Sequence, residues 1–211
     1  CGLRLGEALG LDRTDFDVDL LTLLHGITSL PSVAGSVYHA GVKVNSAPMS
    51  PPSARHPQSG SQRPVHLGVD ALLVQVEIDL SSQLPAMSTV GLAGAEVKES
   101  KDRVRSAIRN SGFKLPARKV TVNLAPADLP KTGTAFDLPI ATALLAAHDV
   151  FDREKLERWV ILGELSLEGQ LRGIPGVLPV ALAARAAGCT LLVPTVNGPE
   201  AGAVAGLDVR T

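Results

Sequence analysis

The sequence predicts an α/β fold, a two-layer sandwich built around a mixed β-sheet. Apolar residues make up 45% of the 211-residue chain but aromatic residues only 3%. The core must therefore be built from Ala, Val and Leu, as in α/β layer folds. Runs that alternate apolar and polar residues predict half-buried strands, and apolar residues at helical spacing predict helices between them. Hairpins early in the chain and β-α alternation late in it indicate the mixed sheet.

The composition excludes several classes of protein. The formal net charge is −1, so nothing indicates a nucleic-acid coat or a membrane-surface protein. Cys1 and Cys189 fit no metal-site spacing, and a disulfide framework is not expected. No apolar run approaches the roughly 20 residues that span a bilayer. We expect a cytoplasmic protein without a membrane partner, and the Cys at position 1 suggests a fragment.

Three segments are predicted along the chain. The first, residues 1–30, opens with the pattern Gly-Leu-Arg-x-x-Glu-x-Leu. Residues 1–24 resemble the start of a tyrosine-recombinase catalytic domain, with Arg4 at the position of the first catalytic arginine. No later His-x-x-Arg follows, and Tyr38 is the only tyrosine, so we interpret this segment as an inert fragment. Residues 31–65 are rich in Ser, Pro and Gly and are predicted to form a disordered linker. Residues 66–211 are predicted to form the globular domain.

Within this domain the patterns predict alternating strands and helices. Strands are expected at 71–80, 87–90, 119–124, 159–164, 190–194 and 207–210, with a hairpin turn at 168–169. Helices are expected at 95–111, 137–147, 176–187 and 199–205. Gly112 is placed to end the first of these helices.

The stretch from Asn123 to Ala147 is the centre of the pattern. A loop rich in Pro and Gly leads into a helix that Asp137 is predicted to N-cap, with Pro139 in its first turn. One apolar face is expected on that helix: Leu138, Ala141, Leu144 and Leu145. A loop that runs onto a helix N-terminus often carries function.

The helix at 95–111 carries the clearly basic zone of the chain. A stripe of four cationic residues follows one side: Lys98, Lys101, Arg105 and Arg109. One interpretation is a solvated face with i,i+4 pairs such as Glu99–Arg103. The other is a contact surface for nucleic-acid phosphate or for an acidic neighbouring domain.

Several long motifs resemble those of one family. They are ESKDRVRSAIRNSGF, KVTVNLAPADLPKTGTAFDLPIA, GELSLEGQLRGIPGVLP and a final P-x-x-N-x-x-E-A. In this order they resemble the N-terminal domain of the Mg-chelatase-like AAA+ ATPases of the YifB/ComM group, although QLPAMSTVGL departs from that pattern. The resemblance implies the fold of the Lon proteolytic domain, which also occurs in a ribosomal small-subunit protein.

The resemblance also implies a role and partners. An AAA+ motor normally follows this domain, and the family is linked to DNA processing as a hexameric branch-migration helicase. ATP and Mg²⁺ are implied only for that motor. We expect a domain that assembles with the motor and with like subunits, or guides DNA to the motor.

Catalysis by the chain itself is not expected. The Ser and Lys positions of the Lon dyad fall on Ala135 and Leu178, and no phosphate-binding Gly-x-x-x-x-Gly-Lys-Ser/Thr run exists. No catalytic, cofactor or metal site is therefore predicted, and Lys131 is expected to be a surface or interdomain contact. Two alternatives stay open: a residual peptidase using Thr132 or Thr134, and a non-functional fragment of a rearranged gene.

Overall fold

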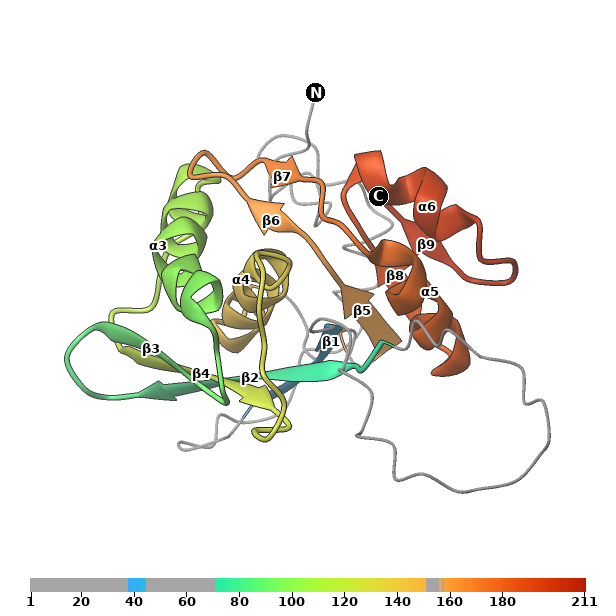
Figure 1. Cartoon of the computed structure of the whole chain (residues 1–211). Helices are drawn as coiled ribbons and strands as arrows, with labels where there is room; N and C mark the ends of the chain where they lie inside the picture. The colour runs from blue at the N-terminus through green and yellow to red at the C-terminus, as the bar shows by residue number, and fades with distance from the viewer. Residues whose placement is uncertain (1–37, 45–70, 151–155, 157) are drawn as a thin grey trace, which may run out of the picture.

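The computed structural model describes residues 38–44, 71–150, 156 and 158–211. The described chain mixes strands and helices in an α/β architecture, as predicted (Figure 1). The recombinase-like segment at 1–30 lies outside the described residues.

A four-stranded sheet forms the base of the molecule, with the strand order β1-β2-β4-β3. Its strands are β1 (Tyr38–Val44), β2 (Val74–Ser81), β3 (Ala86–Val90) and β4 (Lys119–Ala125). β2 pairs antiparallel with both β1 and β4, whereas β3 pairs parallel with β4. Val74, Val76 and Ile78 of β2 are buried, which confirms the predicted half-buried strand.

Strand β1 lies inside the segment predicted to be a disordered linker, so that prediction is wrong for residues 38–44. The strand pairs with β2 in a register that runs from Tyr38 opposite Ile78 to Val44 opposite Val74. β2 therefore has a neighbour on each side. The composition of residues 31–65 does not reveal this strand, because its backbone hydrogen bonds depend on a partner far along the chain.

Helix α3 (Ala95–Asn110) connects β3 to β4 across one face of the sheet (Figure 1). The helix predicted at 95–111 is confirmed, and it buries one face: Val97, Ser100, Val104, Ala107 and Ile108. Gly112 ends the helix with φ +87°, as expected. The N–H of Gly112 donates to Arg109 (3.0 Å) and that of Phe113 to Ile108 (3.1 Å), the two bonds of a Schellman motif.

Helix α4 (Asp137–Ala147) is the central helix, and every residue in it is buried. The four residues predicted to form one apolar face are buried, but so is the rest of the helix, because α4 packs on the sheet and against α3 while the hairpin of β6 (Glu164–Leu165) and β7 (Leu171–Arg172) lies over it (Figure 1). A helix enclosed in this way is apolar around its whole circumference. Asp137 is not the N-cap: Phe136 occupies that position, and Asp137 is the first helical residue.

The C-terminal part forms a second, smaller layer. A three-stranded parallel sheet contains β5 (Trp159–Ile161), β8 (Thr190–Leu192) and β9 (Val209–Arg210), and a hairpin contains β6 (Glu164–Leu165) and β7 (Leu171–Arg172). Helix α5 (Val177–Ala186), the 3-10 turn η2 (Thr195–Asn197) and helix α6 (Gly198–Gly202) complete it. One apolar cluster runs through both parts.

The strand predicted at 159–164 is divided into β5 and β6. The division falls at Gly163, whose N–H donates to the carbonyl of Ala135 (3.1 Å) and whose carbonyl accepts from the N–H of Leu138 (3.0 Å). These bonds take Gly163 out of the sheet and attach it to the start of α4. The hairpin predicted beyond it, at 168–169, is confirmed.

Candidate functional site at helices α3 and α4

The start of helix α4 is closed to an external anion. The N–H of Asp137 donates to the carbonyl of Thr134 (3.2 Å), and that of Leu138 donates to Gly163 (3.0 Å). Pro139 has no N–H, and the N–H of Ile140 already makes the first helical bond, to Phe136 (3.0 Å). Free N–H groups are what let a helix N-terminus bind phosphate. Here these N–H groups already donate to backbone carbonyls of the protein itself.

The Asp137 side chain joins three elements. Its carboxylate is fully buried and accepts hydrogen bonds from Nε of Arg103 on α3 (2.7 Å) and from the Arg103 Nη2 (3.0 Å). The N–H of Leu165 in β6 donates to the same carboxylate (3.2 Å). Burial raises the pKa of Asp137, and the Arg103 bonds oppose that rise. The bond to Asp137 in turn raises the pKa of Arg103.

Arg103 thus forms its ion pair across the fold, and its Nη2 also donates to the carbonyl of Glu96 in its own helix (3.3 Å). The expected Glu99–Arg103 ion pair is wrong, because the guanidinium points to Asp137, 34 residues away in sequence. A bidentate bond between a guanidinium and a buried carboxylate is stronger than an exposed pair on a helix surface. Sequence spacing could not reveal this partner.

Thr134 and Ala135 lie in the loop before α4, whereas Leu178 lies in α5. The Thr134 hydroxyl donates to Oε2 of Glu164 (2.5 Å), and Arg172 donates to the other oxygen of that carboxylate (3.4 Å). Ala135 is half-buried, and its carbonyl accepts from Gly163. Leu178 is 42% exposed in the first turn of α5. The dyad positions therefore present a methyl and an isobutyl group.

Lys131 is buried, so its expected position at the surface is wrong. The whole residue is 0% exposed, and its ammonium donates to the carbonyl of Pro126. Burial lowers the pKa of Lys131, and nearby Asp128 opposes that shift. Its backbone is bonded to the turn between β3 and α3, through Leu92 (3.1 Å) and Gly94 (2.8 Å). The backbone of Lys131 therefore connects the loop before α4 to the turn between β3 and α3 by hydrogen bonds.

The basic stripe is exposed along its length. It consists of the four residues predicted from the sequence: Lys98, Lys101, Arg105 and Arg109. The stripe and the start of α4 are not one site, because Asp137 faces inward while the stripe faces solvent. Lys131, although buried, lines a hollow together with Lys98 of the stripe.

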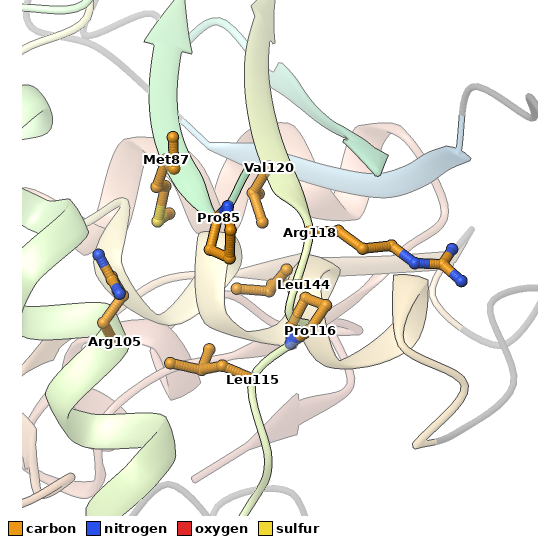
Figure 2. A pocket seen from close by; sticks show the side chains of 9 residues that line it. Pro85, Met87, Arg105, Leu115, Pro116, Arg118, Val120 and Leu144 are labelled. Carbon is orange, nitrogen blue, oxygen red and sulfur yellow. The ribbon is translucent and has the colours of Figure 1, made fainter. Parts of the chain in front are cut away.

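Two hollows flank strand β3, and each includes one residue of the stripe. The first, of about 30 Å³, lies between Arg105, the start of β3 and the segment before β4, with Leu144 of α4 at its floor (Figure 2). Its walls are apolar: Pro85, Met87, Leu115, Pro116 and Val120. Arg118 also lines it, but its guanidinium extends away from the other side chains (Figure 2).

The second hollow, of about 460 Å³, lies at the other end of β3. The turn from β3 to α3 and the loop at Pro130–Thr132 form it, together with Lys98. Among the described residues no group of three His, Cys, Asp or Glu side chains could hold a metal ion. No helix in the part of the chain that the structure describes has the length and apolar character needed to span a membrane.

Comparison with known proteins identifies the family. The family described as subunit ChlI of Mg-chelatase matches residues 76–197, which is more than half of the chain. The chain belongs to the ChlI family. This confirms the resemblance to Mg-chelatase-like proteins.

Individual relatives show which members of the ChlI family this chain resembles. It is 50% identical to the uncharacterized protein YifB of Salmonella typhimurium over 138 residues, 65% of this chain and 27% of YifB. It is also 50% identical to the competence protein ComM of Haemophilus influenzae over 138 residues, with the same shares of each chain. The chain therefore spans about a quarter of the length of these relatives.

A more distant similarity concerns the fold. The chain is 28% identical to the Lon protease of Roseiflexus castenholzii over 144 residues, 63% of this chain and 17% of the protease. This agrees with the Lon-like fold expected from the motifs.

Proposed function

We propose that this chain is the N-terminal domain of a ComM-type AAA+ protein and acts without catalysis of its own. It assembles with an AAA+ motor and with like subunits, as a hexamer in the family, and guides DNA toward the motor. The protein acts in the cytoplasm, and ATP and Mg²⁺ belong to the motor. The name of one relative, competence protein ComM, supports a part in DNA processing during natural transformation.

The observation that carries the DNA contact is the exposed stripe on α3. Its four cationic side chains repeat every three or four residues, so they lie along one side of the helix. Lys and Arg arranged in this way bind phosphates and release the counterions around DNA. Arg103, on the same helix, is not available for this because Asp137 holds it.

The lack of catalysis rests on the positions that a Lon-type peptidase would use. Ala135 and Leu178 offer neither a nucleophile nor a base. The ammonium of Lys131 donates to Pro126, and the Thr134 hydroxyl donates to Glu164. These contacts give the Lys131 ammonium and the Thr134 hydroxyl a structural role in the fold.

Binding of a short fluorescein-labelled DNA duplex to the 211-residue chain tests the proposal. The variant to compare is K98A/R105A/R109A, which removes three charges of the stripe. Each lost phosphate contact should lower the slope of log affinity against log salt by about 0.9, so the triple variant should lose about 2.7.

The matched control is R158A/R185A/R210A, which removes three exposed positive charges from the C-terminal part. It should bind DNA like the wild type. Equal weakening by the two triple variants, or no DNA binding by the wild type at low salt, would leave the domain only its assembly role.

A further inference from the structure

Strand β3 is an open edge of the sheet. Among the described strands it pairs only with β4, so its other side faces no strand. Ala86, Ser88 and Val90 are exposed, and the strand, AMSTV, contains no charge, Pro or Gly. An exposed edge of this kind presents backbone N–H and C=O groups that can pair with another chain.

Helix α3 forms a basic wall beside this edge. Because α3 runs back along β3, Lys98 reaches the hollow at the end of the strand and Arg105 reaches the hollow at its start. The two residues are separated by about 10 Å along the helix. The four steps from Ala86 to Val90 cover a similar distance, about 13 Å. Lys101 lies between them and is exposed.

We call this surface the β3 channel. It comprises the open edge of β3, the exposed Lys98, Lys101 and Arg105 of α3, and the hollow at each end of the strand. The first hollow, about 30 Å³ with apolar walls, has room for the end of an aliphatic side chain and not for a nucleobase.

We propose that the β3 channel binds an extended acidic peptide segment of a partner protein by adding it to the sheet as a further strand. The peptide backbone pairs with the edge of β3. Successive side chains of an extended strand point to opposite faces of the sheet, so carboxylates at alternate positions of the peptide face Lys98, Lys101 and Arg105 of α3.

The chemistry of the channel favours a peptide over a nucleic acid. Positive charge alone would suit either partner. A strand edge, however, is matched by another peptide backbone, because a nucleic-acid backbone has no regularly spaced N–H groups to donate to it. The proposal goes beyond the DNA contact, and it stands whether or not the stripe binds DNA.

An acetylated, amidated peptide of alternating Glu and Val residues is a suitable probe for the 211-residue chain. We expect fluorescence anisotropy to show binding that weakens with salt, and amide hydrogen exchange to slow at Ala86–Val90. The K98A/R105A variant should bind it about tenfold more weakly. R185A/R210A, which removes two exposed charges elsewhere, should bind it like the wild type.

Three results would overturn the proposal. One is equal binding of a peptide with alternating Lys and Val, which would show that charge does not select the ligand. Another is binding of the Glu–Val peptide without slower exchange at Ala86–Val90, which would place it elsewhere. The third is protection of those amides by short single-stranded DNA and not by the peptide, which would assign the channel to nucleic acid. DNA held only by the exposed stripe leaves these amides unprotected.

Discussion

At the scale of single residues, the carboxylate of Asp137 has the most demanding environment. Removal of an ion from water costs several kcal/mol, which only good geometry and further hydrogen bonds can offset. Arg103 and the N–H of Leu165 supply these bonds to Asp137, and the Arg103 side chain keeps 22% of its surface exposed. Loss of one partner without the other should therefore destabilise the fold.

Arg103→Ala should lower the free energy of unfolding by about 3 kcal/mol, because it leaves the buried Asp137 carboxylate without its counter-ion. Urea denaturation measures this change. Arg105→Ala is the matched control, since Arg105 is exposed two positions along the same helix, and it should change stability by no more than about 0.5 kcal/mol. The double variant R103A/D137A should cost less than the sum of the two single changes. Additive costs would show that the pair is not coupled.

Lys131 gives a prediction that depends on pH. Burial lowers its pKa below the ordinary value of 10.5. Between the lowered pKa and 10.5 the unfolded state binds more protons than the folded state, so the stability of the wild type rises with pH in that range. Lys131→Met keeps the aliphatic chain but cannot titrate. At pH 7 it should be at least as stable as the wild type, by up to about 1 kcal/mol.

The advantage of Lys131→Met should shrink as pH rises toward 10.5, because the wild type then loses its buried charge. Unfolding by urea at a series of pH values checks this. A difference that stays constant up to pH 10.5 would contradict the role of the buried ammonium.

At the scale of elements, the turn between β3 and α3 is fixed by close contact. Gly91 has φ +92°, and a Cβ there would lie 2.2 Å from the carbonyl oxygen of Leu124 in β4. Gly91→Ala should therefore lower stability by about 2–4 kcal/mol through strain and displacement of the strand. Gly202→Ala is the control, because nothing lies within 4 Å of its Cβ position, and it should be neutral. The unfolding temperature measures both. A similar temperature for the two variants would show that this turn yields readily.

The elements that the sequence predicted are those governed by local pattern. Alternation predicted β2 and β4, and helical spacing with Gly112 predicted α3 and its end. Strand β1 was missed because it is stabilised by pairing with β2, which lies about 30 residues further along the chain and does not affect the local composition.

The candidate site was predicted only in part for the same reason. The exposed stripe follows from spacing along one helix. The bond from Arg103 to Asp137 and the burial of Lys131 arise only when distant segments meet. Asp137 suits an N-cap by residue type, but Phe136 takes that position and the carboxylate is used by α3 and β6.

At the scale of the whole molecule, helix α4 connects the two parts of the chain. It packs on β1 and β2 of the large sheet, against α3, and against β6 of the C-terminal part. The apolar cluster that includes α4 runs from Val74 in β2 to Val204 beyond α6. A shared core of this kind predicts that the two parts unfold together.

Ile140→Ala tests whether α4 holds the parts together. Ile140 is 0% exposed, so the change should lower stability by about 2–5 kcal/mol through lost burial and a cavity. Trp159, the only tryptophan, lies in β5 and reports the C-terminal part by fluorescence, whereas circular dichroism reports the helices of both parts. The two urea midpoints should fall by the same amount. Leu182→Ala, at a position on α5 that is 42% exposed, should leave both nearly unchanged. If the circular dichroism midpoint fell while that of Trp159 stayed in place, the two parts would be independent, and the single core would not be one folding unit.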